Sequence, residues 1–571
     1  MSLDRRLATP ALTTLLVVLI GLVTGCARIP TDGAVRDGTT ELEQASEIGF
    51  IPAGPTPGAS PDAIVQGFLT NAQAGPTSAA SFAAAQEYLT PAAWRAWDRY
   101  VRVLVLDGDP QLVPEDLEEG ATSTTVTGSA VVVATVDERG VYTEETDPST
   151  VPVTFALTKR ADGEWRISQL ENGLMITTGF FSQAFHLTRL YFPTPDLAWW
   201  VPDVRWFPRQ TWRTDATSEI LAGPPEWLAD STTTVIPEGT SLAIDAVTVT
   251  DDGTIDVSLT STITQATADQ RALAVAQLEA TLVEGEGRDV ELSDGTSPLP
   301  VPDNAVISTP QTRGDALAVS DGALYRVVGQ SLVDLEDAPS LDGLDPTALA
   351  TGPGDRPIVV RDGSDRILRL SGTGVPDVVM TGRDLVPPSV DRFESVWSAR
   401  GNTLLVGLAS GGVQTLDVDW LDTRTVRSVR VSPEGARVAI VSSGPSGRLV
   451  HVAGIQRDAD SVPTGLSTPV QVGASVDQVD VAVWQEDTVL ALIGAEQDGD
   501  RAVFVAGVGG QAGTGGLARV LTGVTEPTWV TASVGSGAML VLDGDDTLHA
   551  RQTSSLWPPV AEGVDLVAYP G

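Results

Sequence analysis

The chain has 571 residues and carries 75 Asp and Glu against 35 Lys and Arg, which gives a formal net charge of -40. A surface this acidic repels nucleic-acid phosphates and anionic headgroups, so we expect no nucleic-acid partner and a membrane attachment that comes from acyl chains. The length and the ordinary apolar fraction of 42% predict several folded domains and exclude a generally disordered chain.

The first residues have the layout of a signal peptide. Arg5 and Arg6 precede an apolar run at residues 11–23, which ends in small residues just before Cys26, the single cysteine of the sequence. As a helix this run would span about 20 Å, well short of the roughly 30 Å hydrocarbon core of a bilayer. We therefore predict a signal peptide at 1–25 that is removed after export, and no intrachain disulfide.

The motif Val23-Thr24-Gly25-Cys26 resembles the bacterial lipobox. The resemblance implies cleavage after Gly25, an S-diacylglycerol on Cys26 and an acyl group such as palmitate on the new amino terminus. Two or three acyl chains anchor a protein durably, because each buried methylene adds about 0.8 kcal/mol. We expect a lipoprotein on the extracytoplasmic face of the cell membrane. The alternative is an unmodified cysteine in an uncleaved leader.

Residues 26–59 are rich in Gly, Pro, Thr and Ser and have no sustained apolar period, which predicts a semi-extended tether. A first α+β domain is predicted at 60–180. Ser60-Pro61 and Thr90-Pro91 are helix start signals, and an apolar face follows the first of them. Beta-rich segments come next, at 126–136, 151–159 and 165–170. This order is similar to the NTF2-like, cystatin-like class.

A second α+β domain is predicted at 186–298. Its expected strands are 191–192, 197–204, 242–249 and 254–259, and its expected helices are 214–222 and a segment opened by the capping-box pair Thr267 and Gln270. Leu273, Ala276 and Leu278 are predicted to face inward on this last helix. The phrases Leu221-Ala222-Gly223-Pro224-Pro225 and Ile236-Pro237-Glu238-Gly239-Thr240, together with residues 277–282, resemble the GerMN domain of sporulation and germination proteins.

Residues 301–571 show short alternating apolar runs separated by tight turns. Six turn centres recur about every 44 residues, which leaves room for four strands per repeat and predicts a six- or seven-bladed β-propeller. The centres are Asp321-Gly322, Asp362-Gly363, Gly411-Gly412, residues 444–447, Asp498-Gly499 and Asp543-Gly544. The predicted fold class is thus multidomain, with two α+β domains and one all-β propeller.

The order of lipobox, NTF2-like unit, GerMN-like unit and propeller resembles the actinobacterial lipoprotein LpqB family over almost the entire mature chain. The resemblance implies a lipoprotein linked to the MtrA/MtrB two-component system, which contacts the sensor kinase outside the membrane and influences cell-wall homeostasis and division. The family supplies no catalytic motif, so Cys26 is the one residue whose defined role carries over.

Candidate catalytic or metal-binding groups are sparse. His186, His451 and His549 are scattered, so we expect ordinary structural positions and no zinc site or other cofactor, although a triad assembled in space stays open. Acidic pairs are expected in turns and solvated loops, and the glycine-rich run 507–516 is expected to be a flexible loop. The pairs are Glu118-Glu119, Glu144-Glu145, Asp251-Asp252 and Asp545-Asp546.

A tryptophan cluster is the strongest candidate for a working surface. Trp199, Trp200, Trp206 and Trp212 fall close together, and the adjacent pair cannot face one side of a strand. We expect the NTF2-like domain to cover them, with a partner-binding surface at Trp199, Trp200 and Trp206 as the alternative.

Two functional hypotheses follow. The first is a non-enzymatic accessory to an envelope sensor kinase, bound through the kinase's extracellular domain. The second is a cell-wall glycan-binding module or envelope hydrolase that uses the propeller channel, because propellers also host hydrolases and sugar binders.

Overall fold

The computed structural model describes residues 51–571 except 78, 114–116, 285–288, 303–305, 313, 373, 496–498 and 511–512. The predicted signal peptide at 1–25, the lipobox residues Val23, Thr24, Gly25 and Cys26, and residues 26–50 of the predicted tether lie outside the described residues. Among the helices that are described, none is both long and apolar enough to cross a membrane.

The first unit opens with three α-helices, α2 (Pro61–Gln73), α3 (Ala79–Gln86) and α4 (Pro91–Ala96). Proline suits the first position of α2 and α4, because an N–H there would have no partner within the helix. Thr90 caps α4, since its hydroxyl accepts a hydrogen bond from the Ala93 amide at 3.2 Å. The predicted inward face of α2 is confirmed by the burial of Ile64, Val65, Phe68 and Leu69.

A mixed sheet packs against α2 and completes the core of this unit. Its strands run in the order β5-β4-β3-β1-β6, with β2 beside β3; β1 and β6 are parallel and the other pairs antiparallel. The ring of Phe68 meets Trp97 and Phe155 edge to face, at 5.1 and 6.3 Å between centroids. The strands are β1 (Arg102–Leu106), β2 (Gln111–Val113), β3 (Ser123–Asp137), β4 (Tyr142–Lys159), β5 (Trp165–Gln169) and β6 (Leu174–Thr177).

Strand β4 starts nine residues earlier than the segment expected from the sequence. The polar stretch that opens it has no apolar alternation, yet it pairs with β3, with Tyr142 opposite Val136 and Glu144 opposite Ala134. Pairing with a long neighbour therefore extends the strand beyond its apolar signal, and this extension carries three residues that contact the propeller, Tyr142, Glu144 and Thr146.

The second unit follows α5 (Thr178–Ala184) and is built on the long antiparallel hairpin of β7 (Phe185–Pro193) and β8 (Trp200–Pro208). Two helices pack beside it, α6 (Trp212–Ala222) and α7 (Ala268–Leu282). A small sheet completes the unit, in which β10 pairs parallel with β11 and antiparallel with β9. Its strands are β9 (Thr248–Val249), β10 (Ile255–Ser258) and β11 (Val290–Ser293).

The start of α7 is set by the predicted capping box. The Thr267 hydroxyl accepts from the Gln270 amide at 3.2 Å, and the Gln270 side chain accepts from the Thr267 amide at 2.9 Å. The predicted inward face is partly wrong, because Leu273 and Ala276 are only half-buried. The helix is rotated so that Gln277 lies inside, where its amide donates to the carbonyl of Tyr191 at 2.7 Å.

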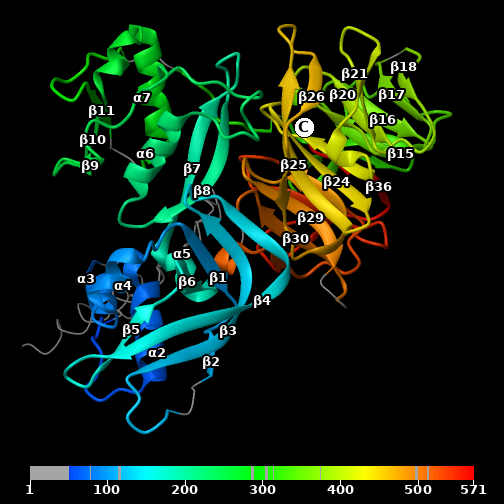
Figure 1. The fold of residues 1–571 in the computed structure, drawn as a ribbon. Coiled ribbons are helices and arrows are strands. Elements are labelled where there is room, and N and C mark those ends of the chain that lie inside the picture. Colours follow the sequence, from blue (N-terminus) through cyan, green and yellow to red (C-terminus); the bar gives the residue numbers. More distant parts are fainter. Residues whose placement is uncertain are drawn as a thin grey trace, which may run out of the picture. The chain divides into compact units, whose positions relative to one another are not determined.

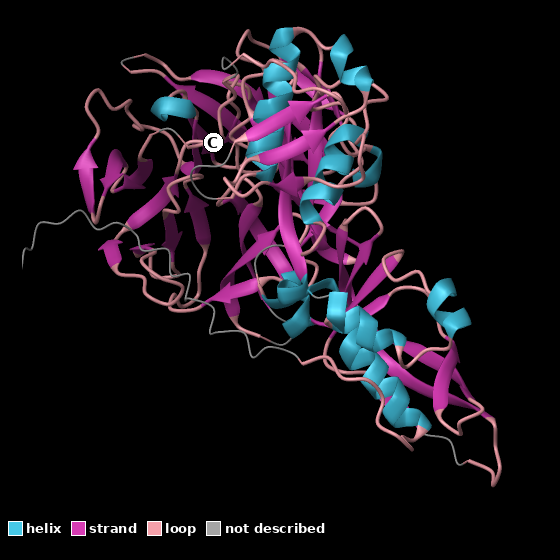
Figure 2. Ribbon diagram, turned by 90° about the vertical axis from the view of Figure 1, so that its left-hand side faces the viewer, coloured by secondary structure: helices cyan, strands magenta, loops and turns pink. Residues whose placement is uncertain are grey.

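The last unit is a propeller in which the described residues form six sheets of at least four strands (Figure 1). Figure 2 shows that the helices gather in the two preceding units and that strands dominate this one. Five of these sheets use strands that are consecutive in the chain. The first two are β15 (Pro346–Thr351), β16 (Ile358–Asp362), β17 (Arg366–Leu370) and β18 (Asp377–Thr381), and then β19 (Ser389–Val390), β20 (Val396–Arg400), β21 (Thr403–Gly407) and β22 (Val413–Leu416). The next three are β23 (Thr425–Val431), β24 (Arg437–Gly444), β25 (Gly447–Arg457), β26 (Pro463–Leu466) and β27 (Val470–Val472); then β28 (Asp477–Trp484), β29 (Val489–Ala495), β30 (Arg501–Gly507) and β31 (Arg519–Leu521); and last β32 (Trp529–Ala532), β33 (Met539–Leu542), β34 (Leu548–Ala550) and β35 (Pro559–Ala561).

The remaining sheet closes the ring, because it combines the two ends of the propeller sequence. Strands β12 (Ala316–Ser320), β13 (Ala323–Val328) and β14 (Ser331–Asp334) are completed by the C-terminal strand β36 (Val564–Ala568), which pairs antiparallel with β12. Closure leaves no open sheet edge between the first and last blades.

The predicted turns locate the blades, but one of them connects a different pair of strands from the others. Asp498 of one predicted turn lies outside the described residues. Of the other five predicted turns, four join the second and third strands of their sheets, whereas Gly411-Gly412 joins the third strand β21 to the fourth strand β22. In that blade the equivalent turn is at Gly401, which has a φ of 63°. Both turns contain glycine, so the sequence signal alone could not choose between them.

Replacing Val567 of β36 with Ala should weaken the ring closure. Val567 is 1% exposed and packs in the core between the first and last blades, so we expect a loss of about 1–3 kcal/mol of unfolding free energy and a lower melting temperature. Val378→Ala, at a side chain that is 57% exposed on β18, is the matched control and should change little. Equal effects of the two variants would contradict the closure.

Candidate functional site: the junction of the three units

Two of the three histidines have hydrogen-bonding partners, in different parts of the fold. His186 stacks on Trp212 at 4.0 Å and its Nε2 lies 2.8 Å from Glu284, while burial lowers its pKa. His549 contacts Asp543 at 2.9 Å. These contacts fit the expected structural positions.

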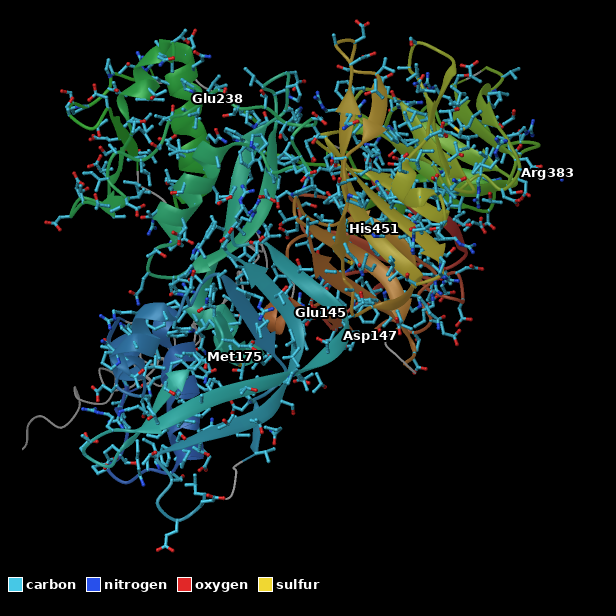
Figure 3. The ribbon with its side chains drawn as sticks, in the orientation of Figure 1. Glu145, Asp147, Met175, Glu238, Arg383 and His451 are labelled. Atoms are coloured by element: carbon cyan, nitrogen blue, oxygen red, sulfur yellow. The ribbon has the colours of Figure 1, made fainter. Side chains whose placement is uncertain are left out.

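His451, labelled in Figure 3, lies on β25 with its Nδ1 buried and without a hydrogen-bond partner. Burial lowers its pKa to about 4, so the ring is neutral at ordinary pH. Within the described residues, no group of three or more His, Cys, Asp or Glu side chains is arranged to hold a metal ion.

Most of the acidic pairs lie on exposed turns, as expected from the sequence. Glu118-Glu119, Asp251-Asp252 and Asp545-Asp546 are exposed. Glu144 is different, because it leaves β4 toward the propeller and accepts hydrogen bonds from the amides of Ala474 and Ser475 at 2.9 and 3.1 Å. Burial raises the pKa of this carboxyl, although its hydrogen bonds act in the opposite direction.

The tryptophan cluster lies inside the molecule. Trp200, Trp206 and Trp212 are about 5% exposed, and Trp199 is half-buried. A partner surface needs exposed rings, so the predicted alternative of a partner-binding surface is wrong for Trp200 and Trp206. The cover is shared: Trp206 belongs to the core of the first unit, as we expected, while Trp199 lies against the propeller.

Trp206 connects all three units. It belongs to β8 of the second unit, and its ring packs 4.7 Å from Phe181 and 6.3 Å from Tyr142 of the first-unit core. Its indole N–H donates to the carbonyl of Gly509 in the propeller at 2.8 Å. A buried indole N–H needs such a partner, so packing and hydrogen bonding fix the same geometry.

The described part of the glycine-rich run after β30, which leaves out residues 511 and 512, docks on the other units and is not the free flexible loop expected from its composition. The Tyr142 hydroxyl donates to the Gly515 carbonyl at 2.9 Å, from a position 373 residues away. A Cβ on Gly510 would overlap the Tyr142 ring, and one on Gly515 would lie 2.7 Å from Thr178. Glycine is required here because the propeller backbone approaches the first unit closely.

The tip of the β7–β8 hairpin lies over the mouth of the propeller. Asp196 at this tip pairs with Arg392 at 2.8 Å, and Trp199 lines a cavity of about 190 Å³ together with the C-terminal Pro570 and Gly571. The amide of Trp200 also donates to the carbonyl of Ser308, in the segment that leads into the propeller.

The central channel beneath this mouth is narrow, with a cavity of about 40 Å³. Inner strands β15, β23, β28, β32 and β36 contribute to its lining. Arg430 lines it, and its guanidinium donates to the carbonyls of Pro388 and Val429 at 2.9 Å. Complete burial lowers the pKa of Arg430 to about 10.

The fold and this junction define a multidomain protein in which an NTF2-like unit and a GerMN-like unit are docked on a six-bladed propeller. Family comparisons divide the chain in the same order. Residues 54–182 match the N-terminal domain of lipoprotein LpqB, residues 189–296 match the sporulation and spore germination domain, and residues 322–570 match the LpqB β-propeller domain.

Similar proteins align with this chain along most of their length. "Lipoprotein LpqB" of Bifidobacterium longum is 27% identical over 77% of both chains, and that of Cutibacterium acnes is 27% identical over 96% of this chain and 97% of its own. "Lipoprotein LpqB" of Thermobifida fusca is 26% identical over 99% of both. The chain belongs to the actinobacterial lipoprotein LpqB family.

Sequence reasoning missed the propeller side of the junction. The contacts of Gly509 and Gly515 with the other units depend on positions about 300 or more residues apart, which no local pattern reveals. The available signal was the pairing of glycines at 509–510 and 515–516, but composition alone does not distinguish a docked loop from a flexible one.

Gly510→Ala should loosen the docking of the first unit on the propeller. Its φ is 77° and the added Cβ overlaps the Tyr142 ring, so we expect about 2–4 kcal/mol of destabilisation, measured by denaturant unfolding and by proteolysis near the junction. Gly537→Ala is the control, since its φ is 69° and nothing lies within 4 Å. Similar losses in both variants would show that the overlap with Tyr142 is unimportant.

Glu144→Gln should remove a pH-dependent term from the stability. A raised pKa means that the folded state keeps the proton to higher pH than the unfolded state, so the wild-type contribution falls as pH rises through the folded pKa. The stability of the variant relative to wild type should therefore rise as pH rises above the ordinary titration range of a glutamate carboxyl, measured by denaturant unfolding at each pH. Glu145→Gln is the control, because it removes the same charge from the adjacent residue and should show no such gain. A gain in both variants would mean that the effect comes from net charge.

Proposed function

We propose that this chain is a lipid-anchored protein on the extracytoplasmic face of the cell membrane and a non-enzymatic accessory to a two-component sensor kinase of the MtrA/MtrB type. In this role it acts in cell-envelope homeostasis and division. The observation that carries the proposal is the junction, which joins three units through buried contacts and presents them to a partner as one body.

The anchor is assigned to Cys26. Its lipobox sequence and the membership of the chain in a lipoprotein family support acylation after cleavage at Gly25. No membrane-spanning segment is needed for this attachment, because two or three acyl chains hold a protein durably at a bilayer.

The non-enzymatic role is supported by what the candidate ionisable groups do. Glu144 is used in docking, His186 is stacked on Trp212, and Arg430 in the channel is bound to backbone carbonyls. Each of these groups already has a structural task, whereas catalysis needs groups that converge on a space open to substrate.

The partner surface lies outside the tryptophan core. The acidic exterior favours a partner with a complementary basic surface, and electrostatic complementarity raises the rate of association. The extracellular domain of a sensor kinase is the partner that the family resemblance implies.

The glycan-binding or hydrolase alternative retains one supporting observation. Trp199, Arg392 and Ser432 line the 190 Å³ cavity at the propeller mouth, and an aromatic ring beside polar groups can bind a sugar. The cavity in the channel itself, at about 40 Å³, is too small to hold a glycan chain.

Mass spectrometry of the membrane-extracted protein, followed by identification of co-purifying proteins in mild detergent, tests the proposal. We expect an acylated amino-terminal Cys26 and a sensor kinase among the partners, and loss of both the modification and membrane retention in Cys26→Ser. An unmodified Cys26 would overturn the anchor, and acylation without a kinase would overturn the accessory role. Retention of the chain on purified cell wall would then favour the glycan alternative.

A further inference from the structure

We propose that the folded part of the chain also touches the membrane directly, through a basic-aromatic face that binds anionic phospholipid headgroups. The basic-aromatic face consists of Phe82, Trp94, Arg95, Arg99, Arg102 and Arg209. The inference rests on the proposed lipid anchor at Cys26 for its setting, since that anchor precedes the first unit in the chain, with the predicted tether between them.

Aromatic rings hold one of these arginines at the surface. The Arg99 guanidinium carbon lies 4.4 Å from the Trp94 ring centroid and 4.9 Å from that of Phe82. Both rings are half-buried, so each packs on the core and keeps part of its surface outside. Arg95 follows Trp94 at the end of α4 and is exposed, with its Nε donating to the carbonyl of Pro91.

Local contacts make the face continuous across the first two units. Phe82 packs on Gly75, whose carbonyl accepts from the side chain of Gln210 at 3.4 Å. The neighbouring Arg209 is exposed and donates to the carbonyls of Ser182 and Gln183.

Arg102 joins the face from the first strand. Gly173 lies against the backbone carbonyl of Arg102, and the carbonyl of Gly173 accepts from the Trp97 indole at 3.0 Å. Trp97 in turn lies beneath Arg99, at 5.3 Å between ring centroid and guanidinium carbon. Strand β1 and the end of α4 therefore present their arginines in the same region.

Within the described part of the chain, none of the four arginines has an ion pair, whereas Arg139 and Arg205 of the nearby junction are paired with carboxylates. The acidic neighbours of the face include Asp98, which accepts from the Tyr100 amide, Asp137, which lies opposite Arg102 in the pairing of β1 with β3, and Asp215, whose pKa is raised by burial. The net charge of -40 is spread over the rest of the chain, and physiological salt screens it beyond about 8–10 Å. At this face the four arginines outnumber Asp98, Asp137 and Asp215.

Phospholipid headgroups match this combination of groups. Guanidinium groups bind phosphate oxygens in a fork, and a partly exposed tryptophan is favourable at the level of the headgroups. A soluble phosphate would use the arginines but would gain nothing from Trp94 and Phe82. The observations thus favour a lipid surface over a free anion.

Vesicle sedimentation of the non-acylated chain tests the proposal. The protein would start at residue 26 and carry Cys26→Ser, so the result does not depend on the anchor, which mass spectrometry of the native chain tests separately. We expect binding to phosphatidylglycerol vesicles, no binding to phosphatidylcholine vesicles, and release by high salt. The pair Arg95→Gln/Arg102→Gln, which leaves Arg99 among its rings, should weaken binding about tenfold or more.

Arg383→Gln/Arg400→Gln is the matched control, because both arginines are exposed on the propeller and the change in net charge is the same. Figure 3 labels Arg383. The control pair should leave binding almost unchanged. Equal loss in the two pairs, or equal binding of the wild type to both vesicle types, would overturn the proposal. The melting temperature of each variant is measured in parallel, to show that it is folded. If the Arg95→Gln/Arg102→Gln variant is unfolded, the salt test of the wild type decides: failure of high salt to release it from the vesicles would overturn the proposal.

Discussion

The position of Trp206 constrains the whole assembly. Its ring packs in the aromatic core of the first unit, and its backbone belongs to the β7–β8 hairpin of the second unit. Its indole N–H donates to the Gly509 carbonyl of the propeller. Loss of any one contact would leave a large ring or a buried donor unsatisfied, at about 1–3 kcal/mol for the donor alone. The three units are therefore coupled, and residues 52–571 form one compact unit.

This coupling explains why groups that resemble chemical candidates serve structure. Glu144 and Tyr142 lie on the extended start of β4 and bind backbone groups of the propeller, while Asp196 and Arg392 hold the hairpin tip at the propeller mouth. The Tyr142 contact is buried and the bond from the Ala474 amide to Glu144 is partly buried, so these two fix orientation. A scaffold of this kind presents surfaces from separate units at fixed distances, which suits the recognition of a membrane protein beside an anchor.

Local signals in the sequence predicted the local structure. Some signals act within one or two helical turns, so they can be recognised in the sequence without knowledge of the fold. They are the pair Thr267 and Gln270, the pair Thr90 and Pro91, and the apolar face of α2. The junction could not be predicted from the sequence, because Trp206 and Gly509 are 303 residues apart and the polar start of β4 has no apolar alternation. The partner-surface hypothesis for Trp200 and Trp206 failed for the same reason: tertiary docking covers rings that composition alone leaves exposed.

Hydrogen–deuterium exchange of the intact chain tests the docked junction most directly. The account predicts that the amides of Ala474 and Ser475, which donate to Glu144, exchange slowly and that Glu144→Ala releases them without changing exchange in the far blade strands β16 and β17. Fast exchange of these two amides in the wild type, at the rate of an exposed loop, would contradict the claim that the three units act as one body.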